Sequence, residues 1–155
     1  MDTKDNTGPH HFSMPAWISC APFEQLLGMN IEKADAGEAI LTMPFVRSLS
    51  QGAGLMHGGA LVSLADTAVV MAIKSVVSPG THFATITMEN RFLHPVKKGV
   101  LVARARVVEH SGCQLKGTCD VFDETDRKVM VFKSVFKIAQ HAEIRNISYD
   151  TNSDP

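Results

Sequence analysis

One long apolar segment constrains the fold of this chain more than any other feature. Residues 60–77 are apolar at most positions, and Asp66 and Lys74 are the two charged residues among them. A helix that is apolar on nearly every side is expected to be buried. A membrane-spanning helix needs about 20 mostly uncharged residues, so the two charges argue against that alternative. The segment therefore predicts a buried core helix.

The carboxylate of Asp66 is the exception inside this helix. An unpaired ionised carboxylate in a protein core is strongly unfavourable, so Asp66 requires a partner, a water-filled cleft or a chemical role. In the structural interpretation, its oxygens accept hydrogen bonds from Ser63, Thr67 or nearby backbone. In the functional interpretation, Asp66 is a catalytic group. Asp66 by itself leaves both interpretations open.

A glycine-rich loop, residues 51–59 with the sequence QGAGLMHGG, leads into the helix. Backbone N–H groups and the positive dipole at a helix N-terminus can bind a phosphate or polarise a carbonyl. The loop lacks the Gly-Lys-Ser/Thr of a P-loop, and His57 stands where a dinucleotide-binding motif needs its third glycine. Carbonyl polarisation at Gly58 is therefore the better hypothesis. The alternative is that Gly58 and Gly59 are turn residues only.

The spacing between Gly58 and Asp66 makes a prediction about assembly. Eight residues of helix correspond to a rise of about 12 Å. One helix therefore cannot bring both groups to the same carbonyl carbon, and if they act together Asp66 must come from a second copy of the chain. A two-fold pairing would create two equivalent sites. The spacing predicts a homodimer with shared active sites.

Four later segments have the alternating pattern of half-buried strands. They are residues 83–93, 100–109, 113–121 and 128–138. In the first, Ala84, Ile86, Met88 and Phe92 are expected to share the apolar face. Short turns join the four segments, which predicts an antiparallel meander.

Earlier in the chain, residues 38–44 predict a strand, and residues 22–27 predict a short helix that ends at Gly28. The expected fold class is α+β, with one long buried helix wrapped by a curved antiparallel sheet. The 155 residues correspond to one domain. We expect it at residues 15–140, with flexible tails at residues 1–14 and 141–155.

Composition limits the classes of function. A formal net charge of −1 argues against a nucleic-acid partner. The N-terminus has no apolar signal segment, so a cytoplasmic location is expected. Three cysteines do not make a disulfide framework, and Cys113 and Cys119 are expected as buried free thiols on one strand face. Metal-binding and serine-nucleophile motifs do not occur, so no metal is expected.

Two motifs together resemble a known family. His57-Gly58-Gly59 followed by residues 63–68, SLADTA, is similar to the motif of hotdog-fold acyl-CoA thioesterases of the phenylacetate-degradation, or PaaI-like, group. The segment Asn90–Pro95 and the strands around it also fit, and the resemblance covers roughly residues 25–139. It implies a hotdog fold that hydrolyses acyl-CoA thioesters, with coenzyme A as part of the substrate and no separate cofactor.

The resemblance also implies roles for single residues. Gly58 matches the residue whose backbone N–H polarises the thioester carbonyl, and Asp66 matches the catalytic base or nucleophile from the neighbouring subunit. His57 matches a loop residue that holds the oxyanion loop or approaches the thioester. Gln51 stands where many members carry Asn to orient water or substrate, and it keeps the amide with a longer reach. Thr85 stands where a relative has Ser or Thr assisting the water.

The remaining expectations concern the substrate and the alternatives. Candidate residues for substrate binding are Leu55, Met56, Gly59 and Phe83 near the acyl group, and Arg91, Lys97 and Lys98 near the phosphates of coenzyme A. Two such dimers are expected to join into a tetramer. The rival function is a non-catalytic acyl-CoA-binding or regulatory hotdog protein, which would not need Asp66, and a dehydratase of the same fold is a minor third option. Aromatic and aliphatic acyl groups are both left open.

Overall fold

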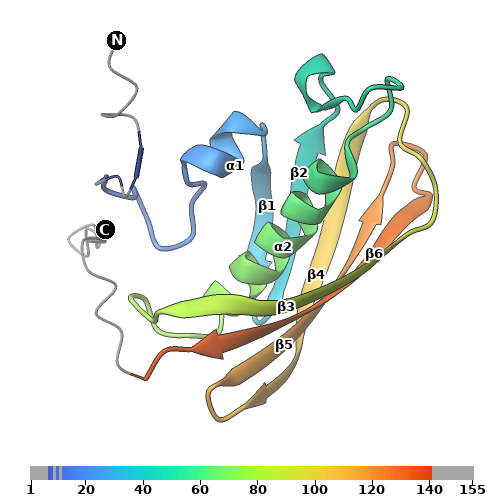
Figure 1. Cartoon of the computed structure of the whole chain (residues 1–155). Coiled ribbons are helices and arrows are strands. Elements are labelled where there is room, and N and C mark those ends of the chain that lie inside the picture. The colour runs from blue at the N-terminus through green and yellow to red at the C-terminus, as the bar shows by residue number, and fades with distance from the viewer. Residues whose placement is uncertain (1–6, 9, 11, 141–155) are drawn as a thin grey trace.

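The computed structural model describes residues 7, 8, 10 and 12–140 (Figure 1). The expected C-terminal tail at residues 141–155 and part of the expected N-terminal tail lie outside the described residues. The elements in chain order are α1 (Pro22–Leu26), β1 (Asn30–Asp35), β2 (Glu38–Pro44), a 3₁₀ turn (Arg47–Leu49), α2 (Gly58–Lys74), β3 (Phe83–Phe92), β4 (Val100–Ser111), β5 (Gln114–Phe122) and β6 (Lys128–Ile138).

Six antiparallel strands form one curved sheet in the order β1-β2-β4-β5-β6-β3, and α2 lies against its inner face (Figure 1). The expected α+β architecture is confirmed. The strands β4, β5 and β6 alternate as the sequence predicts, with buried residues such as Leu101, Leu115 and Phe132 facing the helix. The short helix α1 follows the expected bounds and ends before Gly28, whose φ of 73° suits glycine.

The predicted four-strand meander is wrong in its first link. β3 pairs with β6 at the edge of the sheet, whereas β4 pairs with β2 and β5. The links from β4 to β5 and from β5 to β6 are true hairpins, the first with only Gly112 and Cys113 between the strands. Residues 93–99, by contrast, are long enough to lead from β3 at the edge of the sheet to β4 between β2 and β5. Loop length alone therefore did not identify the neighbour of β3.

The predicted apolar face of β3 is also wrong in part. The register with β6 shifts between Thr85 and Thr87, which is a β-bulge. Cross-strand partners share a face, so pairing of Thr85 with Phe136 and of Met88 with Ser134 puts both residues on the helix side. Ala84 lies before the bulge, on the opposite face, and is exposed. The extra residue at the bulge reverses the alternation.

The apolar pattern predicted that α2 is buried on nearly every side. The helix is buried against the sheet, but one of its sides is not. Leu64, Ala68 and Met71 are among its ten buried residues. A stripe on its other side is only half-buried, and it consists of Val62, Ser63, Asp66, Val70 and Lys74. We call these five residues the open stripe. Asp66 therefore lies at the margin of the core.

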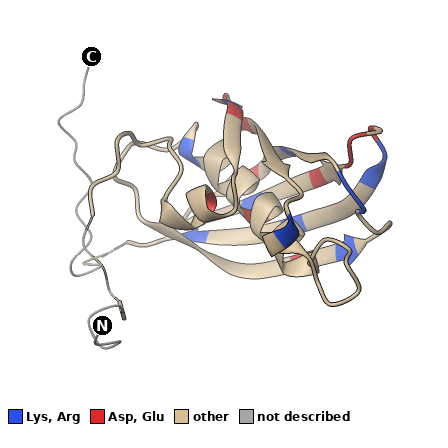
Figure 2. Cartoon of the chain, turned by 90° about the horizontal axis from the view of Figure 1, so that it is seen from above, with Lys and Arg blue, Asp and Glu red and all other residues tan. Residues whose placement is uncertain are grey.

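The cysteine prediction holds for one of its two residues. Cys119 is buried on β5, as expected. Cys113 precedes β5 and is half-buried in the turn, where the side-chain nitrogen of Gln140 lies 2.9 Å from its sulfur. Figure 2 shows basic and acidic residues interspersed along strands and turns. No helix in the described part of the chain is long and apolar enough to span a membrane.

Candidate active site

The N-terminus of α2 is held by His57. Its Nδ1 accepts the backbone N–H of Gly59 at 2.9 Å, and its carbonyl accepts the N–H of Ala60 at 3.0 Å. Among the described residues, the N–H of Gly58 donates no hydrogen bond. The first turn of the helix thus presents one available donor at its positive end. Such a donor can polarise a carbonyl oxygen.

A pocket of about 380 Å³ lies beside this donor. Its walls come from the glycine loop, the first turn of α2 and the chain that follows β3, and they include Gln51, Leu55, Met56, Gly58, Leu61 and Phe92. A Cβ atom on residue 58 would lie 3.1 Å from Cζ of Phe92, a tight contact that glycine avoids. Sequence reasoning had placed Phe92 only on an apolar strand face.

The side chain of Gln51 contributes to the shape of the loop. Its Oε1 accepts the N–H of Ala53, and its backbone carbonyl accepts the N–H of Gly54 at 2.9 Å. The loop is therefore closed on itself, with the amide oxygen already engaged. The NH₂ group of Gln51 is the part that can act as a donor toward the pocket.

Asp66 is paired with a residue from another element. The hydroxyl of Thr85 on β3 donates to Oδ1 of Asp66 at 3.2 Å. Ser63, a partner in the structural interpretation, donates instead to the carbonyl of Gly59 at 2.7 Å. Burial raises the pKa of Asp66 above its ordinary value, the hydrogen bond from Thr85 partly opposes this rise, and the nearby carboxylate of Glu24 adds to it. Sequence reasoning missed Glu24, because no motif links α1 to α2.

Gly58 and Asp66 are separated within one chain, as the helix geometry requires. The helical rise between them is about 12 Å. Both groups nevertheless lie under the edge strand β3. Asp66 contacts the start of β3 through Thr85, and Gly58 lies beneath its end at Phe92. The two groups of candidate residues therefore lie at opposite ends of β3.

The other predicted residues are distributed around these two groups. Met56 is buried beside Gly58, and Phe83 contacts Phe136 edge-on, with ring centroids 5.8 Å apart. Arg91 pairs with Val131 on the outer face of the sheet, away from α2. Lys97 and Lys98 lie on the loop after β3 and line a second pocket of about 310 Å³.

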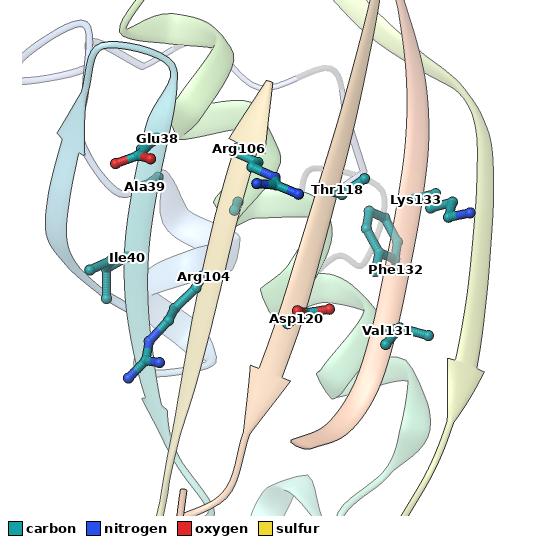
Figure 3. Close-up of a pocket in the computed structure, with 11 residues that line it drawn as sticks. Glu38, Ala39, Ile40, Arg104, Arg106, Thr118, Asp120, Val131, Phe132 and Lys133 are labelled. Carbon is teal, nitrogen blue, oxygen red and sulfur yellow. The ribbon is translucent and has the colours of Figure 1, made fainter. Parts of the chain in front are cut away.

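Two further observations concern other parts of the described chain. The described residues contain no group of three or more His, Cys, Asp or Glu side chains arranged to hold a metal ion. A hollow of about 640 Å³ lies on the outer face of the sheet (Figure 3). Its exposed side chains, such as Glu38, Arg106 and Lys133, carry both signs of charge, and it contains no residue of the predicted site. This hollow is a solvated sheet face.

Comparison with known proteins identifies the family of the chain. The sequence profile described as "Thioesterase superfamily" matches residues 53–130, half of the chain. A Halobacterium salinarum protein named "Putative esterase" is 36% identical over 87 residues, covering 53% of this chain and 57% of that protein. The Bacillus subtilis protein "Putative esterase ComA2" is 24% identical over 115 residues, covering 74% and 91% of the two chains.

Solved structures show the same fold. The E. coli PaaI protein from the phenylacetic acid degradation operon superposes with a TM-score of 0.72 and 26% identity, covering 83% of this chain and 88% of that chain. A conserved Pseudomonas aeruginosa protein gives a TM-score of 0.75 at 24% identity, covering 79% and 97%. The matched segment contains both groups of candidate residues, Gly58 and Asp66 with Thr85. This chain belongs to the thioesterase superfamily of hotdog-fold proteins.

Proposed function

We propose that the protein hydrolyses acyl-CoA thioesters to the free acid and coenzyme A. The observation that carries the proposal is the pair of half-sites under β3. One half is a carboxylate held by a hydroxyl, Asp66 with Thr85, and the other is the available N–H of Gly58 at a helix N-terminus. Hydrolysis of a thioester needs both an activated oxygen and a donor to the carbonyl oxygen.

The chemistry follows from these two groups. The Gly58 N–H donates to the thioester oxygen as negative charge develops there. Ionised Asp66 either accepts a proton from the attacking water or attacks the carbonyl carbon itself, giving an anhydride that water then opens. In both routes the C–S bond breaks, and the coenzyme A thiolate leaves and takes up a proton. The hydroxyl of Thr85 holds the carboxylate in place.

A homodimer completes the site in this proposal. The edge strand β3 has ten residues and exposes about half of the surface of Ile86, Met88 and Phe92 (52%, 52% and 50%). Such an edge is a template for another strand, whereas the short opposite edge, β1, carries charges and an irregular register. Antiparallel pairing of two β3 strands would bring the Thr85 end of one subunit toward the Phe92 end of the other. Asp66 would then face the partner's Gly58.

Charge favours a particular register for this pairing. With Asn90 on the two-fold axis, Glu89 lies opposite Arg91 of the partner subunit on the outer face. Met88 then lies opposite the partner's Phe92 on the helix face. Opposite charges and apolar residues in such pairs stabilise a sheet by roughly 0.2–1 kcal/mol each. In this arrangement Arg91 contributes to the interface rather than to binding of phosphate.

The proposed path of coenzyme A leads away from Gly58. The pocket beside Gly58 and the pocket lined by Lys97 share Pro95. Lys98 already pairs with Glu124 at 3.4 Å. Lys97 is therefore the better candidate for a phosphate contact. Met56 and Phe83 would border the reacting group from the two sides.

Release of free thiol from a panel of aromatic and aliphatic acyl-CoAs tests the function. We expect turnover by the wild-type protein and a loss of about 100-fold or more in Asp66→Asn, the usual contribution of a general base. Asp35→Asn, a change at an exposed carboxylate on β1, is the matched control and should retain activity. Binding of acyl-CoA without turnover by the wild type would favour the non-catalytic alternative.

A further inference from the structure

Residues 15–20 are anchored to the C-terminal end of α2 by a reciprocal contact. The indole Nε1 of Trp17 donates to the carbonyl of Lys74 at 3.0 Å, and the Lys74 ammonium donates to the carbonyl of Trp17 at 2.9 Å. The same ammonium lies 4.7 Å from the centroid of the indole ring. We call this pair the clasp. It binds a carbonyl that the helix end would otherwise leave unpaired, and a cation–π contact adds to it.

The clasp and the catalytic carboxylate lie on the same stripe of α2. Asp66, Val70 and Lys74 are spaced four residues apart, so they follow one another along one side of the helix. The rise from Asp66 to Lys74 is about 12 Å. Val70 and Ile18 are partly buried and pack against the core. The stripe is therefore apolar between its two charged ends.

The two ends of the stripe differ in what they can admit. In the proposed dimer, the Asp66 end of the stripe faces the partner's Gly58, and the pockets and basic loop beside that glycine suit the nucleotide of coenzyme A. At the Lys74 end, the chain of residues 15–20 is fixed across the helix by the clasp. This end suits an acyl chain, which is apolar and ends in a methyl group, better than a large polar group.

We propose that the acyl chain of the substrate lies along the open stripe over Val70 and ends against Trp17, and we call this proposed path the channel. Trp17 is then the residue that sets the maximum acyl-chain length, and the clasp holds its ring in position. The inference rests on the proposed thioesterase function and adds the location of the acyl group and its length limit. The stripe suits a chain of medium length.

The test compares kcat/KM for butanoyl-, octanoyl-, dodecanoyl- and hexadecanoyl-CoA in three variants. Trp17→Ala opens the end of the channel, and we expect the ratio of hexadecanoyl to octanoyl turnover to rise about 10-fold or more. Val70→Phe narrows the middle and should shift the preference toward butanoyl-CoA. Phe12→Ala, at an exposed aromatic residue earlier in the same segment, should leave the profile unchanged.

The outcomes separate this inference from the function on which it rests. If the wild type hydrolyses thioesters while Trp17→Ala and Val70→Phe both keep its chain-length profile, the channel is wrong and the function stands. If Trp17→Ala does not fold, judged by circular dichroism, an unchanged profile in Val70→Phe overturns the channel alone. If the wild type hydrolyses no chain length, both proposals fail.

Discussion

At the residue scale, the state of Asp66 depends on opposing influences. Burial and the Glu24 carboxylate raise its pKa, because both disfavour the negative charge, and the Thr85 hydroxyl lowers it by donating a hydrogen bond to that charge. The proposed chemistry needs the ionised form. Activity should therefore fall as the pH drops through this raised pKa, at a higher pH than for an ordinary aspartate.

Two substitutions should shift the acidic limb of the pH profile, the range in which activity falls with falling pH, in opposite directions. Thr85→Val removes a group that lowers the pKa, so the fall in kcat/KM should occur at higher pH. Glu24→Gln removes a group that raises the pKa, so the fall should occur at lower pH. Profiles of kcat/KM against pH measure both. A shift in the same direction in both variants, or none in either, would show that Asp66 does not govern the limb.

At the scale of the element, α2 carries both candidate groups, Gly58 at its start and Asp66 about two turns later. Its start is capped, and the side that carries Asp66 is only half-buried. The cap is His57 through Nδ1, and an added Cβ on Gly59 would lie only 3.0 Å from this atom. The cap fixes the first turn and therefore the position of the Gly58 N–H. We infer that His57 acts as a positioning residue through this contact.

Replacement of His57 separates capping from direct chemistry. His57→Ala should destabilise the fold by about 0.5–2 kcal/mol, the typical cost of a lost helix cap, and reduce kcat. Asn is among the best capping residues, so His57→Asn should restore stability and most of kcat. Urea unfolding and steady-state kinetics measure the two effects. Stability restored without activity would instead favour a direct role of the imidazole.

At the scale of the whole molecule, the open edge of β3 is the main unsatisfied feature of the described chain. It carries exposed apolar residues directly above the half-sites. Pairing of two copies would cover the edge and complete both sites at once. A tetramer of two such dimers and the cytoplasmic location remain predictions.

Mixed dimers test whether the sites are shared. Asp66→Asn retains the N–H of Gly58. Gly58→Pro removes this N–H at the first helical position, where proline is tolerated, and retains Asp66. Each variant alone should be inactive. After refolding an equal mixture, half of the dimers contain both chains and each has one intact site, so about a quarter of wild-type activity should return. No recovery from a mixture shown to contain the mixed dimer would place both groups in one chain.

Local patterns in the sequence were sufficient for α1, α2 and the strands β2 to β6, but not for β1, and they supplied the candidates along α2. The apolar run predicts a core helix because helical periodicity repeats over many residues, and alternation predicts β4, β5 and β6 because their register is regular. The loop before α2 identifies Gly58 because a helix N-terminus has the same donors in any protein. The eight-residue spacing to Asp66 separates the two groups because helical rise is constant.

Other features depend on contacts between residues that are distant in sequence, and only the tertiary structure decided them. The bulge at Ile86 turns Thr85 toward Asp66, although strict alternation points it away. The strand β3 is an edge strand because it pairs only with β6 in the sheet. The turn residues in the sequence do not specify which strand will be its neighbour. Trp17 meets Lys74 across 57 residues because the sheet and helix bring them together. The sequence by itself determined the chemical groups and their local geometry, and packing determined which of them meet.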